Sequence, residues 1–440
     1  MKKRTMWVAI ALIMMATAAL TGCSSDIDNQ ELTPEIGPVV PPTTMNLTRA
    51  EQEMVDQSNE FSFNLFRMAT MEGESGPCFE PPKSVILSPI SITYALGMLN
   101  NGAAGETLAQ INKVLGFEKA GADSINAFCY KMLNMVSSNT DPLTKVMIAN
   151  NIYVNKIYEL NPYFVQKAET FYNAHPETRD FNDGKTVDVI NQWASDHTEQ
   201  MIDKVLDDQT FDPSAVSYLL NAIYFKGTWT YKFDKAETKD EVFDHPGWTE
   251  ELMYRPMMHQ QAEFEYAEND DFQALRLPFG SKRNDDALPG CSFVMTVLLP
   301  KAQANVLPMV PTAQEWQQLN QKMQITKADV KLPRFENDTD IDLKPIMTKL
   351  GMPDAFDLYK ADFPYFCNTE VFISLMKQVA KIKLDEEGTE AAAVTVIAVN
   401  EKASISGPNY LIFHANHPFL YVISEQQTGA IFFIGQYTGY

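Results

Sequence analysis

The stretch from residue 385 to residue 400 carries the strongest functional pattern in the chain. An acidic Glu386-Glu387-Gly388 segment precedes a run of small and β-branched residues without proline. Gly388 can adopt backbone angles that other residues avoid, so it can act as a bend that opens or closes. The run after it fits an ordinary strand, and it also fits a segment that starts as an exposed loop and later becomes a strand.

Alternate residues of an extended chain face the same way, so this run has two distinct faces. One face is compatible with burial in a sheet and carries Thr389, Ala391, Ala393, Thr395, Ile397 and Val399. The other carries Glu390, Ala392, Val394, Val396, Ala398 and Asn400. The only charge in the run, at Glu390, is therefore expected to face outward.

Other patterns that could support chemistry are incomplete. The chain has no G-x-S-x-G nucleophile elbow and no H-E-x-x-H zinc pair. Gly184-Lys185-Thr186 resembles the end of a phosphate-binding loop, but Arg179 occupies the position of the first glycine. His414 and His417 would face opposite sides of a strand, and no third metal ligand is evident. We therefore predict that the chain is not an enzyme and holds no metal or cofactor.

The length, composition and net charge of the chain limit its possible size class and binding partners. With 440 residues, of which 45% are hydrophobic, the chain can form one large domain or two ordinary ones. Its formal net charge of −22 argues against nucleic acid and heparin-type polyanions, because those partners need clustered Lys and Arg. We expect a monomer that binds neither nucleic acid nor a heparin-type cofactor.

The N-terminus is predicted to be a targeting segment. Lys2, Lys3 and Arg4 precede an apolar stretch from Trp7 to Leu20, which is short for a membrane span. The following Leu20-Thr21-Gly22-Cys23 resembles the lipobox of bacterial lipoproteins. Residues 1–22 would then be a signal peptide, with Cys23 lipidated. We expect an exported lipoprotein of the outer membrane, facing the periplasm, the cell surface or the extracellular space.

Residues 23–45 are polar, acidic and rich in proline after Cys23, which predicts a flexible tether. Four further cysteines are far apart in the sequence and show no metal-ligand spacing: Cys78, Cys129, Cys291 and Cys367. The sequence leaves open whether any of them form disulfides or whether they are buried free thiols.

Helical and strand patterns mix without the regular alternation of a doubly wound fold, which predicts an α+β domain over residues 46–440. Thr48 and Glu51 form a capping-box pattern at its start. Ser88 and Pro89 begin a helix, with the serine as its cap. Strands are expected over Val216–Trp229, Phe293–Leu299 and Leu411–Ser424, and a terminal hairpin over Phe419–Ile434.

Together these segments resemble the serpin family over essentially all of residues 48–440. The matching motifs are Ser84–Ser91 with Ala95–Leu99, Asn221–Trp229, Leu343–Pro345 with Leu350–Met352 and Ala361–Phe363, Glu386–Thr395, and Asn416–Phe419 with Phe432–Gly435. The resemblance implies three β-sheets, eight or nine helices and an exposed reactive loop over about residues 386–410. It also implies that the hinge of this loop is Glu386, Glu387, Gly388, Thr389, Glu390, Ala391, Ala392 and Ala393.

Inhibitory members of this family trap serine proteases, with cysteine proteases as a second target class. The protease attacks the loop and forms an acyl-enzyme, and the cut loop then inserts into the large sheet A and distorts the protease. By the family's spacing, the reactive bond is Lys402-Ala403, fourteen residues beyond Gly388. A lysine before that bond suits trypsin-like proteases, whose specificity pocket is acidic.

The position of the bond has two open alternatives. The interval from Gly388 to Pro418 is about five residues longer than in common family members, which can shift the register. Val396–Val399 also offers bonds suited to elastase-like proteases. The expected place of the extra length is Ala403–Tyr410.

The resemblance also assigns residues to two regions of sheet A, the shutter and the breach. Ser88, Ser91 and Asn221 match a polar shutter cluster, in which Gln378 replaces the usual histidine, so no pH sensitivity is expected there. Trp229 matches the breach residue where the sheet opens. The alternative functions are a non-inhibitory serpin that acts as a binding or chaperone-like protein and, more remotely, an enzyme. Non-inhibitory relatives usually carry Pro or charged bulk in the hinge, and this chain does not.

Overall fold

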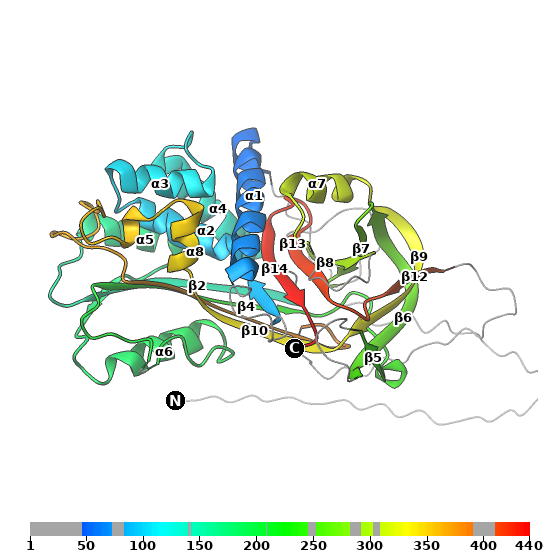
Figure 1. The fold of residues 1–440 in the computed structure, drawn as a ribbon. Helices are drawn as coiled ribbons and strands as arrows, with labels where there is room; N and C mark the ends of the chain where they lie inside the picture. Colours follow the sequence, from blue (N-terminus) through cyan, green and yellow to red (C-terminus); the bar gives the residue numbers. More distant parts are fainter. Residues whose placement is uncertain are drawn as a thin grey trace, which may run out of the picture. The chain divides into compact units, whose positions relative to one another are not determined.

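We describe a computed structural model, which defines residues 46–72, 83–139, 141, 143–207, 209–244, 252–281, 292–301, 309–389 and 410–440 (Figure 1). Several sequence-based predictions lie outside these residues and are not addressed by the fold. They are the signal peptide, Cys23, the tether, Cys78, Cys291, Glu390, Ala391, Ala392, Ala393, Lys402 and Ala403.

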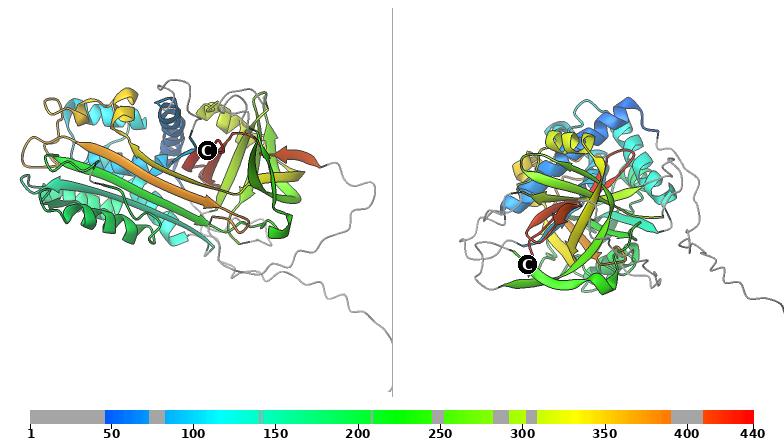
Figure 2. Two further views of the ribbon diagram at one scale, coloured as in Figure 1. Left: turned by 60° about the horizontal axis from the view of Figure 1, so that its bottom comes forward. Right: turned by 90° about the vertical axis from the view of Figure 1, so that its right-hand side faces the viewer.

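One of the two sheets has five strands. Its order is β10 (Phe335–Asp342), β11 (Leu375–Leu384), β4 (Ser217–Gly227), β2 (Thr144–Asn155) and β3 (Glu177–Arg179). Strands β10 and β11 are antiparallel, as are β2 and β4, whereas β11 and β4 are parallel neighbours. Figure 2 (left) shows β11 in orange beside β4 in green.

The remaining strands form one continuous nine-stranded sheet. Its order is β1 (Val85–Leu87), β14 (Ile431–Tyr437), β13 (Phe419–Glu425), β8 (Phe293–Pro300), β7 (Phe272–Pro278), β6 (Met253–Glu268), β9 (Gln324–Pro333) and β12 (Leu411–His414), and β5 (Lys239–Phe243) pairs with β6. Two of the three expected sheets are thus joined edge to edge. The reason is the length of β6, which pairs with β7 at one end and with β9 along most of its length.

The structure describes eight α-helices, within the expected range. They are α1 (Arg49–Glu72), α2 (Pro89–Asn100), α3 (Gly105–Leu115), α4 (Ala122–Asn139), α5 (Pro162–Tyr172), α6 (Thr186–His197), α7 (Ala313–Gln321) and α8 (Lys344–Leu350). Helices α2 to α5 lie on one face of the five-stranded sheet and α6 lies on the other (Figure 1). Among the described helices, none combines the length and apolarity that a membrane crossing requires.

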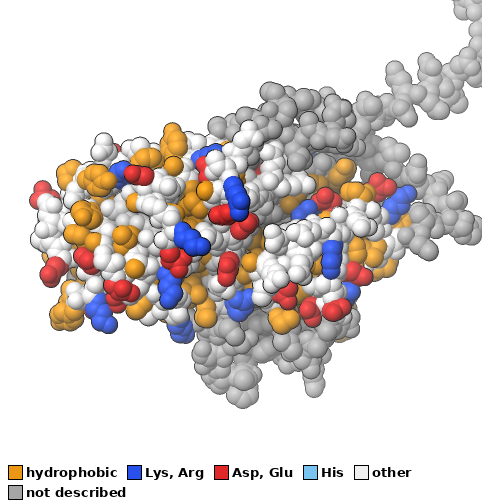
Figure 3. All heavy atoms as spheres, turned by 90° about the horizontal axis from the view of Figure 1, so that it is seen from above, with side chains coloured by type: hydrophobic (Ala, Val, Ile, Leu, Met, Phe, Trp, Pro, Cys, Tyr) orange, Lys and Arg blue, Asp and Glu red, His pale blue; other side chains and the backbone are white. Residues whose placement is uncertain are grey.

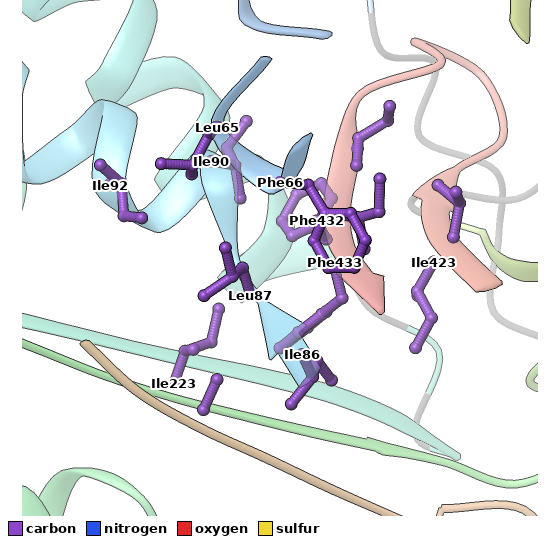
Figure 4. Close-up of a cluster of buried hydrophobic side chains, with 14 of the residues drawn as sticks. Leu65, Phe66, Ile86, Leu87, Ile90, Ile92, Ile223, Ile423, Phe432 and Phe433 are labelled. Atoms are coloured by element: carbon purple, nitrogen blue, oxygen red, sulfur yellow. The ribbon is translucent and has the colours of Figure 1, made fainter. Parts of the chain in front are cut away.

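The main core lies between α1, α2 and the two sheets. Leu65 and Phe66 of α1 meet Ile90 of α2 and the phenylalanines of the terminal hairpin, Phe432 and Phe433 (Figure 4). Every residue of α2 is buried, as expected for a helix that is apolar all round. A second, smaller core packs Ala194 and other residues of α6 against the opposite face of the sheet.

Local predictions from the sequence are largely confirmed. The capping box forms, since Glu51 N donates to Thr48 Oγ1 over 3.3 Å and Thr48 N donates to Glu51 Oε2 over 2.6 Å. The terminal hairpin is antiparallel as predicted. Cys129 and Cys367 are buried free thiols, and burial raises the pKa of each to about 12. One prediction is wrong: Ser88 occupies the cap position of α2, but its side chain makes no capping hydrogen bond.

Candidate functional site: a hinge at an open sheet seam

A tight turn after β11 sets the direction of Glu386–Thr389, the described part of the segment that the sequence predicts to be the hinge and that is called the hinge below. Asp385 N donates to Gly388 O over 2.8 Å, and Gly388 N donates back to Asp385 O over 3.2 Å. Gly388 has φ +136°, in the region that favours glycine. A Cβ there would lie 2.7 Å from Thr228 Cα and would collide with Gly227 O. The turn therefore requires glycine both for its conformation and for its close approach to β4.

Thr389 extends this contact into the sheet. Its side chain is buried, its N–H donates to Gly227 O over 2.6 Å, and Gly227 N donates to its hydroxyl. An isolated antiparallel bridge pairs Gly388 with Thr228. The chain therefore already runs antiparallel to β4 where the described part of the hinge ends.

Trp229, the residue expected at the breach, donates two hydrogen bonds to the backbone of this turn. Its indole Nε1 donates to Asp385 O over 2.9 Å, and its backbone N donates to Glu387 O over 2.8 Å. The ring stacks on Phe279 with centroids 4.3 Å apart. Trp229 is therefore more than core packing, because it binds the hinge backbone directly.

The two hinge glutamates are anchored to different parts of the fold. The side chain of Glu386 is 2% exposed and pairs with Arg334, which lies between β9 and β10, and accepts from Thr238 Oγ1 over 2.6 Å. Glu387 pairs with Lys232 Nζ at 2.5 Å and Lys235 Nζ at 3.2 Å. The sequence patterns did not identify Arg334, Lys232 or Lys235.

These contacts shift the acidity of both hinge carboxyls. Burial by itself raises the pKa of Glu386, but hydrogen bonds from Arg334 and Thr238 outweigh it, and the pKa is lowered. Burial likewise raises the pKa of Glu387, but hydrogen bonds from Lys232 and Lys235 lower it overall. Both groups are therefore ionised anchors of the hinge at neutral pH.

We expect these anchors to fail in acid. Because each folded-state pKa lies below the unfolded value of about 4.3, the ionised glutamates stabilise the fold above that pH. This stabilisation is lost as the pH falls through the folded-state pKa. A Glu386→Gln, Glu387→Gln variant should be less stable at pH 7, and its thermal midpoint should decline less steeply than that of the wild type below about pH 4.3. Identical pH profiles would contradict the anchoring role, and exposed Glu118→Gln is the control.

A polar cluster lies halfway along the same strands and contains all four residues expected in the shutter. Gln378 and Asn221 are direct partners across β11 and β4. Gln378 Nε2 donates to Asn221 Oδ1 over 2.5 Å and to Ser88 O over 3.0 Å, and Gln378 Oε1 accepts from Ser88 N over 2.9 Å. Asn221 Nδ2 also donates to Ser91 Oγ. Gln378 thus uses both its donor and its acceptor to join the two strands to α2.

The sequence reasoning missed one member of this cluster. Asn150 lies directly opposite Asn221 on β2 and accepts from Asn221 Nδ2 over 2.6 Å. The signal available in the sequence was the Asn150-Asn151 pair within an otherwise apolar strand pattern. Ser88 Oγ is buried and has no hydrogen-bond partner among the described residues, so this serine contributes only its backbone to the cluster.

The seam between β4 and β11 opens toward the hinge. Their parallel pairing ends at Tyr224 and Lys381, although β4 continues to Gly227 and β11 to Leu384. On their outer sides both strands stay paired to these ends, with β2 and β10 respectively. Beyond Tyr224 and Lys381 the two strands are therefore not paired with each other, and Gly227 bonds Thr389 instead.

The two histidines of the remaining sequence pattern have different partners. His414 Nε2 lies 2.8 Å from Asp329 Oδ1, whereas His417 Nε2 lies 3.0 Å from Pro300 O. Burial lowers the pKa of His417. No group of three or more His, Cys, Asp or Glu side chains within the described ranges is arranged to hold a metal ion. On the face shown in Figure 3, basic and acidic side chains of the described residues are interspersed.

Comparisons with known proteins agree with this architecture. The family model described as serpin, serine protease inhibitor, matches residues 56–439. Serpin B8 of Homo sapiens is 32% identical over 397 residues, covering 88% of this chain and 99% of the relative. The native structure of tengpin, a thermophilic serpin, has a TM-score of 0.76 at 27% identity and covers 91% of this chain and 96% of its own.

A third comparison shows that the fold alone does not fix the function. Human thyroxine-binding globulin in complex with its ligand has a TM-score of 0.75 at 24% identity, covering 88% of this chain and 98% of its own. The open seam, the hinge beside it and the family match define the class of protein: this chain belongs to the serpin family of serine protease inhibitors. The α+β class and the serpin fold expected from the sequence are confirmed.

Proposed function

We propose that this protein is a suicide-substrate inhibitor of serine proteases, with cysteine proteases as a second target class. Its cleaved reactive loop would insert between β4 and β11 while the protease is still bound as an acyl-enzyme. The observation that carries the proposal is the antiparallel contact of Thr389 with Gly227 at the open end of a parallel seam.

The geometry favours insertion on simple grounds. Antiparallel pairing is somewhat more stable per residue than parallel pairing, and a strand between β4 and β11 would be antiparallel to both. Insertion exchanges one short parallel ladder for two longer antiparallel ones, which makes the uninserted fold metastable relative to the inserted one.

The existing bridge sets the register of the inserted strand. With Gly388 opposite Thr228 and Thr389 opposite Gly227, residues 389–399 would pair with the whole of β4 down to Ser217. These eleven residues span about 37 Å at about 3.4 Å each. Lys402 would then lie beyond the start of β4, opposite Ser214. A protease attached there would be carried to the far end of the sheet.

The same register tests the two faces deduced from the sequence. Directly opposite residues share a face of a sheet. Ala391, Ala393 and Ile397 would therefore join Phe225, Ile223 and Leu219 in the main core. Thr395 would enter between Asn221 and Gln378, so insertion requires these two side chains to exchange their mutual hydrogen bond for new partners.

The alternative is a non-inhibitory serpin that binds other molecules. It is kept open by the likeness to thyroxine-binding globulin, which binds its ligand on this fold. The absence of Pro in the hinge favours the inhibitory proposal. The two functions differ in whether the cut loop inserts.

The deciding experiment mixes residues 46–440 with trypsin and, separately, with elastase. The products are resolved on denaturing gels, and the released peptide is identified by mass spectrometry. We expect a complex that survives boiling in SDS and a peptide that begins at Ala403. Clean cleavage without a complex, and without a gain in thermal stability after cutting, would favour the non-inhibitory alternative. A different first residue would move the reactive bond while retaining the mechanism.

A further inference from the structure

A single carboxylate joins three neighbouring strands at one end of the nine-stranded sheet. Asp329 lies on β9, between β6 and the short strand β12. Its Oδ1 lies 2.8 Å from Nε2 of His414 on β12 and 3.2 Å from Nε2 of His259 on β6, and its Oδ2 accepts from Gln261 Nε2. Burial raises the pKa of Asp329, but hydrogen bonds from His414 and Gln261 outweigh it, and the pKa is lowered. An ionised carboxylate only accepts hydrogen bonds, so both imidazoles donate to it.

The neighbouring lysine does not compete for this carboxylate. Lys331 lies between His414 and His259 in the register, on the same face of β9 as Asp329. Its Nζ pairs with the two carboxylate oxygens of Glu241 on β5, at 2.6 and 2.7 Å. The charge of Lys331 is thus matched by Glu241, and Asp329 keeps its bonds to the two histidines.

The strand β12 depends on Asp329 more than its neighbours do. It has four residues and, among the described strands, pairs only with β9, in the parallel orientation that is slightly less stable per residue. Of its side chains Phe413 is buried, whereas Ile412 is 56% exposed. By contrast, β6 and β9 are paired antiparallel from Met257 to Tyr266 of β6. The bond from His414 therefore matters for the docking of β12, while the bond from His259 joins strands that are already paired along their length.

The reactive loop returns to the body of the protein at β12. The loop is expected to end at about residue 410, and β12 starts at Leu411. Its partner β9 leads through Arg334 into β10, whose first residue, Phe335, pairs with Leu384 beside the hinge. The strand β12 therefore lies on the hinge side of the five-stranded sheet (Figure 1).

The length of the loop opposes its full insertion while it is uncut and β12 is docked. In the proposed register, residues 389–399 run about 37 Å along β4, away from the hinge end. Residues 400–410 would then have to return over that length and continue to Leu411. Eleven residues reach at most about 40 Å when fully extended. Almost nothing is left for the step from the hinge end to Leu411, so full insertion of the uncut loop requires release of β12 from β9.

We propose that Asp329 is a positioning residue of the inhibitor, which through His414 holds β12 on the sheet and so opposes insertion of the uncut loop. The proposal rests on the function proposed above. A protein that lacks this bond would still fold and would trap protease when fresh. It would pass more quickly into an inserted, inactive form, so the bond sets the working lifetime of the inhibitor.

The first test follows the lifetime of the uncut protein, which is stored, sampled over time and titrated against trypsin. Asp329→Ala and His414→Ala should each shorten the half-life of inhibition about tenfold, as expected for the loss of a hydrogen bond to a charged group. Because the two residues act as a pair, the double variant should be no worse than either single one. Asp329→Asn keeps an acceptor oxygen for His414 and should recover most of the half-life.

His259→Ala is the matched control. It removes an imidazole from the same carboxylate, but its bond lies between β6 and β9, so the half-life should change about twofold at most. The product of ageing separates positioning from a general loss of stability. It should be uncut, monomeric and more resistant to heat than the fresh protein, because the loop has joined the sheet. Inactivation of Asp329→Ala by unfolding or aggregation would overturn the proposal, as would a half-life equal to that of the wild type.

The second test needs no protease. Ala415 N donates to Lys331 O over 2.8 Å directly after β12, so hydrogen exchange at this amide reports release of the strand. Exchange should be about tenfold faster in Asp329→Ala than in the wild type and unchanged in His259→Ala. Equal exchange in Asp329→Ala and the wild type would show that Asp329 does not hold β12. A wild-type protein that forms no SDS-stable complex would instead overturn the proposed function, and the exchange rates would still decide the role of Asp329.

Discussion

Thr389→Arg is expected to convert the inhibitor into a substrate. Thr389 is buried at the first rung, with its backbone and its hydroxyl bonded to Gly227. An arginine cannot occupy this buried site without a partner, so in the uncut protein it would move out of the site to reach solvent. Insertion would force it back under the sheet, and a buried unpaired charge costs several kcal/mol. Since each 1.4 kcal/mol changes a rate about tenfold, insertion should slow by about 100-fold or more and lose to deacylation.

The readout is the ratio of covalent complex to cleaved inhibitor after reaction with trypsin. Thr389→Ser, which keeps the hydroxyl, is the control and should retain most of the complex. The rate of loop cleavage itself should not change, because the reactive bond is remote from residue 389 in the sequence. Complex formation by the arginine variant as efficient as that of the wild type would show that the hinge does not enter the sheet.

Gly388→Ala is expected to weaken the uninserted fold strongly. The substitution combines an unfavourable positive φ with a Cβ that meets Gly227 O and Thr228 Cα. Backbone strain and forced displacement in a packed site each cost about 1–3 kcal/mol, so the combined loss should be about 2–6 kcal/mol. The measurement is the urea midpoint of the uncut protein. The unfolding rate is a second readout, because the lifetime of a metastable fold depends on its unfolding barrier.

A matched glycine separates the two causes. Gly351 follows α8 with φ +116°, and no atom lies within 4 Å of its Cβ position. Gly351→Ala should therefore show the cost of the backbone angle alone and lose less stability than Gly388→Ala. Equal losses in the two variants would mean that the close approach of the hinge to β4 contributes nothing.

The contacts that anchor the hinge show where sequence reasoning stops. Glu386 and Glu387 stand out in the sequence as an acidic pair beside a glycine, but their partners Arg334, Lys232 and Lys235 carry no local signal. These partners come from segments about 50 to 155 residues away and meet only because β9, β10 and the end of β4 converge on the hinge. Their identity depends on tertiary packing.

In the polar cluster at Asn221, too, some members could be identified from the sequence and others only from the structure. Ser91, Asn221 and Gln378 match a family motif, and they are brought together as that motif implies. Asn150 became visible only through the register of β2 with β4, and the orphan hydroxyl of Ser88 only through the packing of α2. A one-residue change of register would turn Asn150 to the other face, and no feature of the isolated strand prevents that.

By itself, the sequence determined what depends on neighbouring residues or on motif order: the capping box at Thr48, the terminal hairpin, the serpin family and the proline-free hinge after Gly388. Only the tertiary structure decided that β4 and β11 are parallel neighbours and that their seam opens at Thr389. The physical reason is that strand pairing joins residues about 157 positions apart in the chain, and its register is selected by burial of whole faces rather than by local preference.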